Sequence, residues 1–419
     1  MSEDALLASP ARRDWLVDGP LAAIADHYIA TLRRQRYATG TIGAYIRCLA
    51  HFSYWLQVEG LDLDAVQISL IQRFLAHLPD CACPPPRKAT VADCSAALGH
   101  LRCLIAKDAS DDDAVRIMTT PVSAELERFR HYLTYTCGLA ANTCQYRLKH
   151  VGAFLALHPG AASMGTAELR ARDIEDFVEA LAQHWRPASL GVIRSSLSSY
   201  LRFRALAGDQ TQVLIAALPR IANWTHTTLP RALSEVDIAI LLAAFDQAAP
   251  AGLRDFAVAR CLLDLGLRGQ EVAHLQLDSL NWRDGTLIIG DAKDRRAHRL
   301  PLPAATGEAI ARYLQYGRPS TSNRAVFVRH VAPVDEPLSV AGIRNIMNRA
   351  FARCGLADRF CNTHVFRHTA AVRLQRAGAS LKETADLLRH RSLDTTANYA
   401  RVDLERLRSI ALPWPGRWT

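Results

Sequence analysis

The first half of this chain carries the same succession of amphipathic helical segments twice. Apolar residues recur at helical spacing between residues 15 and 108, with a break at Pro84–Pro86 before the last of these segments. A similar order returns about 100 residues later at nearly constant spacing. The matched positions are Thr41 and Thr143, Phe52 and Phe154, Phe74 and Phe177, Leu101 and Tyr200. The pattern predicts two related helical modules, with independent amphipathic patterning as the alternative.

Composition indicates a globular chain that suits a polyanionic partner. Its 419 residues and apolar content of 49% suffice for two or three domains, each with a buried core. Fifty Lys and Arg residues, mostly Arg, against 41 Asp and Glu residues give a formal net charge of +9. Such a surplus of guanidinium groups favours contacts with phosphates. We find no apolar run long enough to span a membrane.

The ten cysteines show no familiar disulfide or metal pattern. Most lie within apolar helical segments, and no C-x-x-C pair occurs. The pair Cys81 and Cys83 is spaced too closely for a usual zinc knuckle, so we assign no metal and no cofactor. The N-terminal residues are acidic and lack the apolar core of a secretion signal. We therefore expect reduced thiols and a cytoplasmic protein.

Residues 363–399 form three short predicted helices, which carry the side chains best suited to catalysis. Thr363 is expected to cap the first helix, with His364 and Arg367 at positions i and i+3 of its opening turns. Gly378 is expected to end this helix. An H-x-x-R pair alone is common on helix surfaces, so an inert surface pair is the alternative.

The second and third helices bring two further groups. Ser380 and Glu383 form a capping box, and the helix that they begin is expected to end near His390. Asp394 caps the next segment, which carries Tyr399. On one unbroken helix His390 and Tyr399 would point in opposite directions, so the break between them is what lets them converge. A permanently charged arginine, two imidazoles and a phenol suit an anionic tetrahedral substrate, such as a phosphodiester.

This stretch resembles the C-terminal signature of the tyrosine recombinases, the phage-integrase family. In that family H-x-x-R-H-T is followed by Leu-Gly-His, then by two threonines and a tyrosine. Here the signature stands at residues 364–369, at 388–390, at Thr395–Thr396 and at Tyr399. Arg389 departs from the pattern, because the family usually has Gly there, and the departure affects the turn of the backbone at this point.

An upstream box extends the resemblance. The run from Gly266 through Arg268 to Glu271 resembles the family's G-L-R-x-x-E, whose arginine is the first of two that clamp the scissile phosphate. This implies the clamping role for Arg268 and a supporting role for Glu271. An Arg–Glu pair that serves stability alone is the alternative.

A basic hairpin follows this box. Residues 286–290 are a predicted strand and 299–303 its return partner. The family's hairpin carries a lysine, and Lys293 takes that position as the one lysine of the turn. Arg296 and His298 are the alternatives.

The resemblance implies a complete catalytic set: Arg268, Lys293, His364, Arg367, His390 and Tyr399. Tyr399 would attack the phosphodiester and form a 3′-phosphotyrosyl link, while the two arginines hold the non-bridging oxygens. Lys293 would protonate the 5′-oxygen that leaves, His364 would take the proton from Tyr399, and His390 would bond a phosphate oxygen. No metal is needed, because the arginines supply the positive charge.

The expected fold is mainly α, with a small antiparallel β-sheet in the C-terminal catalytic domain and two N-terminal helical modules that resemble the family's SAM-like core-binding domain. The expected boundaries are 1–112 for an N-terminal helical module, 113–218 for a core-binding domain that binds DNA, 219–230 for a linker and 231–419 for the catalytic domain. The candidate DNA-binding residues are Arg147, Lys149, Arg194, Arg202, Arg295 and Arg296.

We therefore expect a site-specific recombinase or integrase, cytoplasmic, bacterial and associated with the nucleoid, whose partner is double-stranded DNA. The resemblance implies self-assembly into a tetramer on DNA, with a sister recombinase as a further option. The additional N-terminal module favours the integration or transposition of a mobile element. A catalytically silent DNA-binding protein on the same scaffold and a nick-and-reseal enzyme similar to type IB topoisomerases are the alternatives.

Overall fold

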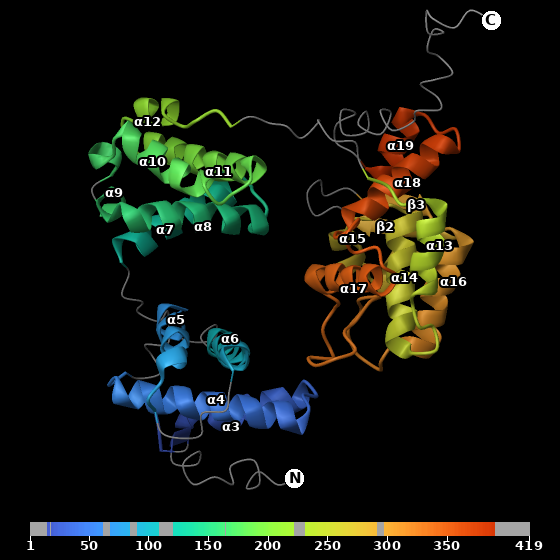
Figure 1. Cartoon of the computed structure of the whole chain (residues 1–419), viewed down its shortest axis with the longest axis horizontal. Coiled ribbons are helices and arrows are strands. Elements are labelled where there is room, and N and C mark those ends of the chain that lie inside the picture. The colour runs from blue at the N-terminus through green and yellow to red at the C-terminus, as the bar shows by residue number, and fades with distance from the viewer. Residues whose placement is uncertain are drawn as a thin grey trace, which may run out of the picture. The chain divides into compact units, whose positions relative to one another are not determined.

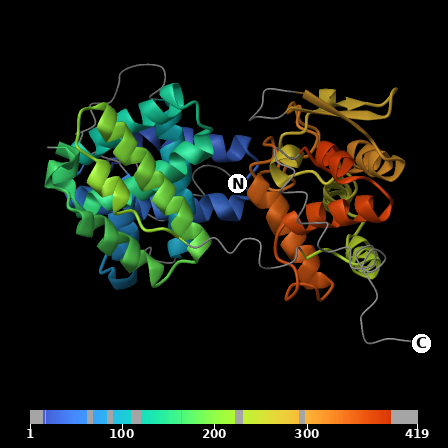
Figure 2. The same cartoon turned by 90° about the horizontal axis from the view of Figure 1, so that it is seen from above.

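The structure is a computed structural model of the chain. It describes residues 15–16, 18–61, 68–83, 90–108, 120–163, 165–221, 231–290 and 297–389. The described residues build three hydrophobic cores, each from one stretch of the sequence. Figures 1 and 2 show the helices and strands around these cores. Within these ranges we find no helix with the length and apolar character needed to cross a bilayer.

The first core is formed by helices in the described part of residues 16–104. They are α3 (Ala22–Arg34), α4 (Thr39–Val58), α5 (Ile68–His77), the short 3-10 helix η2 (Leu78–Asp80) and α6 (Val91–Asp108). Helix α6 begins after Thr90, whose hydroxyl accepts the backbone N–H of Asp93 at 3.1 Å. The buried Tyr28 of α3 donates its hydroxyl to the carbonyl of Ala97 in α6, which ties these helices together.

The second core spans residues 129–218 and repeats this plan with additions. Its elements are α7 (Pro121–His131), the π-helical turn η3 (Tyr132–Thr136), α8 (Ala141–Leu157), α9 (Pro159–Ser163), the 3-10 helix η4 (Thr166–Glu168), α10 (Ala171–Ala182), α11 (Pro187–Leu206) and α12 (Gln212–Ala216). Proline at the first position of α7 and α11 fits the helix N-terminus, where its missing N–H has no intrahelical partner to lose.

Matched residues of the two modules occupy equivalent places in the two cores. Phe52 meets Phe74 edge to face, with ring centroids 5.0 Å apart, and Phe154 meets Phe177 in the same way at 5.2 Å. All four rings are buried. The matched positions therefore pair in the same way in both cores, as expected for two related modules.

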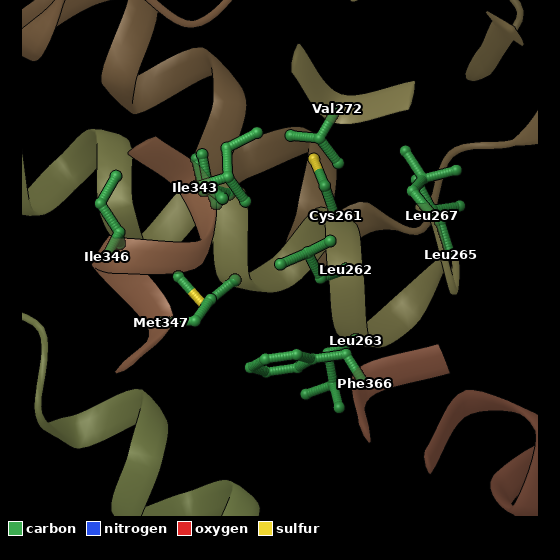
Figure 3. Packing of buried hydrophobic residues seen from close by; sticks show 14 of the residues in the cluster. Cys261, Leu262, Leu263, Leu265, Leu267, Val272, Ile343, Ile346, Met347 and Phe366 are labelled. Carbon is green, nitrogen blue, oxygen red and sulfur yellow. The ribbon is translucent and has the colours of Figure 1, made fainter. Parts of the chain in front are cut away.

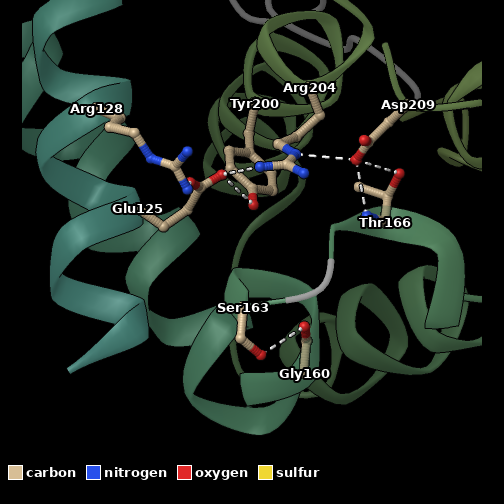
Figure 4. Close-up of polar contacts among 8 residues, drawn as sticks. All are labelled: Glu125, Arg128, Gly160, Ser163, Thr166, Tyr200, Arg204 and Asp209. Atoms are coloured by element: carbon tan, nitrogen blue, oxygen red, sulfur yellow. Dashed lines mark hydrogen bonds and ion pairs between the residues drawn. The ribbon is translucent and has the colours of Figure 1, made fainter. Parts of the chain in front are cut away.

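The second module also contains a buried ionic network (Figure 4). The carboxylate of Glu125 is fully buried and accepts hydrogen bonds from Arg204 at 2.9 Å and from the Tyr200 hydroxyl at 3.0 Å. Arg204 also donates to Asp209 at 2.9 Å, and Asp209 accepts the backbone N–H of Thr166 at 2.8 Å. The network joins α7, α11 and the first residue of η4.

The third core spans residues 233–366 and surrounds α14. Its helices are α13 (Glu235–Ala243), α14 (Pro250–Asp264), α15 (Gly269–Ala273), the 3-10 turn η5 (Leu277–Ser279), α16 (Ala304–Arg312), the π-helical turn η6 (Tyr313–Gly317), α17 (Val340–Arg353), α18 (His364–Arg376) and α19 (Leu381–Leu388). Figure 3 shows Cys261, Leu262 and Leu263 of α14 beside Met347 of α17 and Phe366 of α18. This packing fixes the start of α18, where the catalytic motif lies.

A three-stranded antiparallel sheet accompanies these helices, in the order β1 (Leu280–Asn281), β2 (Thr286–Gly290) and β3 (Ala297–Pro301). The predicted first strand is confirmed, while its partner begins and ends two residues earlier than predicted, in a register that pairs Leu287 with Leu300. The two residues of β1 were too few to give a sequence signal. Outside this sheet, Ala325 forms an isolated β-bridge with Gln276, and Val328 forms one with Pro337. The mainly helical fold with a small antiparallel sheet is confirmed.

Candidate active site

The first turn of α18 presents His364 and Arg367, as predicted from the sequence. The predicted cap is wrong in its detail. Thr363 occupies the N-cap position with helical backbone angles and makes no side-chain capping bond. The side chain of Asn362 accepts the N–H of His364 instead, at 2.9 Å. The asparagine therefore satisfies an N–H that the helix itself leaves open.

Arg367 is buried, with 4% of its surface exposed, and its guanidinium contacts two distant backbone segments. It donates to the carbonyl of Gly266 at 2.8 Å and to the carbonyl of Leu388 at the end of α19. Gly266 has a positive φ of 57°, which turns the chain before α15. An arginine keeps its charge under such burial, so these carbonyls hold a fixed positive charge.

Arg268 lies at the N-cap of α15, and Glu271 holds it there. The guanidinium donates to one carboxylate oxygen of Glu271 at 2.8 Å, and the backbone N–H of Arg268 donates to the other at 2.7 Å. A further guanidinium N–H donates to the carbonyl of Arg389 at 3.3 Å. Since 38% of the Arg268 side chain stays exposed, the group is both fixed and open to an anionic ligand. The expected supporting role of Glu271 fits this geometry.

Arg389 is the residue whose contribution the sequence did not reveal. It ends α19 in the left-handed conformation (φ 56°, ψ 50°), the conformation that glycine adopts without strain. The turn therefore forms despite the departure from the family pattern. Its side chain is only 3% exposed and donates to Glu271 at 2.8 Å and to the carbonyl of Leu387 at 3.0 Å. The one sequence signal of this contribution was the presence of arginine where the family usually has glycine.

Glu271 thus lies between two arginines. Burial alone would raise the pKa of its carboxyl, but the Arg389 guanidinium, the N–H of Arg268 and the Arg268 charge together hold the pKa below its ordinary value. The carboxylate remains charged at neutral pH and orients both guanidinium groups.

Two histidines share the same helix turn. Desolvation is the largest cause that lowers the pKa of His364, and the charges of Arg367 and Arg268 lower it further. The pKa of His368 is also lowered, by desolvation, then by His364 and Arg367. At neutral pH both imidazoles are therefore neutral, and His364 is able to accept a proton.

The structure brings three of the six predicted catalytic residues together: Arg268, His364 and Arg367. Three lie outside the described residues: Lys293, His390 and Tyr399. Arg295 and Arg296 of the hairpin also lie outside the described residues, whereas the alternative His298 lies in β3 opposite Ile289.

The candidate DNA-binding residues of the second module differ in their contacts. Arg194 donates to the carbonyl of Pro219 at 2.9 Å and Arg147 donates to the Ser199 hydroxyl at 2.7 Å, so both have structural partners. Lys149 on α8 and Arg202 on α11 are exposed.

Arg147 and Arg202 lie close to one common side chain. A hydrogen bond with Cys137 is the largest cause that raises the pKa of Tyr132, and the charges of Arg202 and Arg147 oppose this rise. Arg147 of α8 and Arg202 of α11 are therefore both near the side chain of Tyr132.

Comparisons with known proteins identify the family. Residues 231–406 match the model of the Phage integrase family. A protein of Sinorhizobium fredii (strain NBRC 101917 / NGR234) named integrase/recombinase y4rA is 33% identical over 401 residues, which cover 95% of this chain and 96% of that protein. Tyrosine recombinase XerD of Listeria monocytogenes serotype 4b (strain F2365) is 27% identical over 297 residues, or 68% of this chain and 96% of XerD.

Solved structures share the fold. XerH site-specific recombinase bound to palindromic difH substrate aligns with a TM-score of 0.53 and 16% identity, over 70% of this chain and 97% of XerH. The Tn1549 transposon integrase in complex with transposon right end DNA aligns with a TM-score of 0.51 and 14% identity, over 68% of this chain and 99% of the integrase. From the family match and the likeness to y4rA over nearly its whole length, the chain belongs to the phage integrase family, the tyrosine recombinases, which cleave and rejoin DNA through a phosphotyrosine intermediate.

Proposed function

We propose that Tyr399 is the nucleophile of a strand exchange in which Arg268 and Arg367 bind the scissile phosphate. The phenolic oxygen forms a bond to phosphorus while the bond to the 5′-oxygen breaks, which leaves a 3′-phosphotyrosyl link and a free 5′-hydroxyl. A 5′-hydroxyl of the other strand reverses the step and releases the tyrosine. The phosphodiester energy stays in the protein–DNA bond, so the exchange needs no ATP and no metal.

The position of the two arginines is the observation that carries this proposal. They come from distant motifs, yet Arg367 donates to the carbonyl of Leu388 and Arg268 to the carbonyl of Arg389, which are consecutive residues. Two fixed guanidinium groups suit the non-bridging oxygens of a phosphate and the charge that grows in the pentacoordinate transition state. Their support by carbonyls and by Glu271 limits the reorganisation needed when DNA binds.

The proton transfers are assigned to three further residues. His364 accepts the proton of Tyr399, which its lowered pKa supports because a neutral imidazole is needed. Lys293 donates a proton to the 5′-oxygen that leaves, and His390 bonds a phosphate oxygen. The roles of Lys293 and His390 rest on the motif positions in the sequence.

We further propose that residues 113–218 form the core-binding domain and that residues 231–419 form the catalytic domain, joined by a linker at 219–230. Helices α8 and α11 would contact the DNA backbone through the exposed Lys149 and Arg202. Arg147 and Arg194 are weaker candidates, because Ser199 and Pro219 already accept hydrogen bonds from them. Arg295 and Arg296 of the hairpin would add contacts near the catalytic site. Residues 1–112 form an additional helical module.

The biological reaction we propose is the integration or transposition of a mobile element. The integrase/recombinase name of the y4rA protein and the transposon integrase among the structures of the same fold support it. We also propose that the chain assembles into a tetramer on DNA, with or without a sister recombinase. The proposed location is the bacterial cytoplasm, in association with the nucleoid.

The deciding experiment traps the covalent link. A labelled duplex with a nick beside a candidate element end loses the short strand after cleavage, so the protein–DNA adduct accumulates. Wild type is expected to give a labelled band on a denaturing gel that protease removes. Tyr399→Phe should give none. Tyr316→Phe, which alters an exposed tyrosine of the same region, should behave as wild type.

An adduct that persists in Tyr399→Phe would refute the assignment of the nucleophile. Sequence-specific DNA binding by wild type without any adduct would favour a catalytically silent DNA-binding protein. Relaxation of supercoils at many sites, without strand exchange between two duplexes, would favour a topoisomerase-like enzyme.

A further inference from the structure

Two histidines and two cysteines, none of them among the residues assigned to the recombination chemistry, converge in the first helical module. His51 comes from the middle of α4, His77 from the last position of α5, and Cys81 and Cys83 from the segment after η2. One ligand atom of each residue, nitrogen or sulfur, lies within 4.8 Å of all the others.

The distances within this cluster approach those of a metal centre. The Nε2 atom of His51 lies 3.4 Å from the sulfur of Cys81, and Nε2 of His77 lies 3.3 Å from the sulfur of Cys83. In a tetrahedral zinc site with Zn–S near 2.3 Å and Zn–N near 2.0 Å, a sulfur and a nitrogen ligand are about 3.5 Å apart. Both His–Cys pairs therefore already have the separation of ligands that share one ion.

The surroundings suit a bound ion as well. His51 is buried, and its ring meets Phe74 edge to face with centroids 5.1 Å apart. Phe74 and Trp55 also flank His77, at centroid distances of 6.2 Å and 6.3 Å. An apolar wall of this kind excludes water from one side of a metal site. Cys81 and Cys83 are half-buried, so the other side remains open to an entering ion.

A backbone contact adds support for a thiolate. The N–H of Cys83 donates to the sulfur of Cys81 at 3.4 Å. Such N–H···S bonds stabilise the negative charge that a metal-bound thiolate carries. From the sequence alone, the close spacing of Cys81 and Cys83 argued against a zinc knuckle. His51 lies thirty residues upstream of Cys81. Only folding brings this histidine to the pair.

We propose that the N-terminal module binds one Zn²⁺ through His51, His77, Cys81 and Cys83. Two thiolates and two imidazoles match the ligand preference of zinc, and four protein ligands complete a tetrahedral shell. A closed shell of this kind indicates a structural role. The ion fastens the segment after α5 to α4, beside the contact of α5 with α4 visible in Figure 1.

Metal analysis of the full chain, purified under reducing conditions and without an affinity tag that binds metal, tests the proposal. Wild type is expected to retain about one zinc per chain, as four-ligand sites do. The double variant Cys81→Ser/Cys83→Ser should retain almost none. Cys103→Ser serves as the matched control, because this exposed cysteine lies on α6 of the same module but outside the cluster, and it should retain zinc as wild type does.

Cobalt gives a second readout, which the wild type alone can provide. Addition of Co²⁺ to the metal-free wild type should produce the intense sulfur-to-cobalt absorption of thiolate ligation and the visible bands of tetrahedral Co²⁺. Zinc should abolish both. The signals should be absent in the double variant and present in Cys103→Ser.

The unfolding temperature completes the test. A chelator should lower it for wild type and for Cys103→Ser, and should leave the double variant unchanged. Wild-type protein that holds no zinc, shows no thiolate band with Co²⁺ and ignores the chelator would overturn the proposal. The cluster would then be a set of thiol–imidazole hydrogen bonds.

Discussion

Replacement of Arg389 by alanine tests how far this residue supports the phosphate-binding arginines. The change removes a buried hydrogen bond to the Glu271 carboxylate and one to the Leu387 carbonyl. A hydrogen bond to a charged group contributes about 1.5–3 kcal/mol. Glu271 keeps two donors from Arg268, so the loss stays below the cost of a fully orphaned charge. We expect the local free energy of unfolding to fall by about 2–3 kcal/mol.

A glycine variant separates the side chain from the backbone. Arg389→Gly loses the same hydrogen bonds but removes the strain of a side chain in the left-handed conformation, which amounts to roughly 1 kcal/mol. Arg389→Ala keeps that strain. The alanine variant should therefore be less stable than the glycine variant, and both should be less stable than wild type.

Native-state hydrogen exchange, resolved to peptides that cover α15, α18 and α19, measures this local stability. When the locally unfolded segment closes faster than its amides exchange, a loss of about 2–3 kcal/mol in local stability accelerates hydrogen exchange about 30- to 150-fold. The glycine variant should exchange about fivefold more slowly than the alanine variant. Peptides from the first module are the internal control. Exchange rates in both variants within twofold of wild type, or a glycine variant faster than alanine, would refute the reasoning.

Three further outcomes follow from the structure. Arg204→Ala should destabilise the second module by about 3–5 kcal/mol in urea unfolding, because Asp209 and the buried Glu125 each lose a hydrogen bond from a charged donor; Arg128→Ala, whose guanidinium is 63% exposed, should cost less than about 1 kcal/mol. Gly266→Ala should cost about 2–4 kcal/mol by thermal unfolding and reduce adduct formation, because its φ is positive and the new Cβ meets the side chain of Leu388. Because the pKa of His364 is lowered in the folded chain, the unfolded chain binds more protons near pH 6.5. The free energy of unfolding should therefore fall as the pH drops below about 6.5. Urea titrations at several pH values measure this dependence, and His364→Gln should weaken it.

Local signals in the sequence predicted most elements that position the site. The capping box Ser380–Glu383 is confirmed, and Gly378 ends α18 with a positive φ of 94°. These signals act over three or four residues, so no tertiary information is needed to read them. The cap of α18 shows the limit of such local prediction. Thr363 was expected to cap this helix, but the side chain of Asn362 accepts the N–H of His364 instead.

Contacts between distant segments could not be predicted in the same way. Arg389 departs from the family pattern, and only the folded chain shows that its side chain reaches Glu271. Likewise His51 gives no sign in the sequence that it will meet Cys81, since it lies within an ordinary amphipathic helix. Packing of helices creates both contacts, and a local pattern contains no information on that packing.

Two consecutive carbonyls at the end of α19 link the two arginines. Leu388 accepts from Arg367, and Arg389 accepts from Arg268, so one short junction contacts both charges. Gly266 also binds Arg367, and Glu271 also binds Arg268, so each guanidinium has one anchor of its own and one anchor in the shared junction. A shift of the backbone at Leu388 and Arg389 therefore changes one hydrogen bond of each arginine at the same time, which couples the positions of the two guanidinium groups.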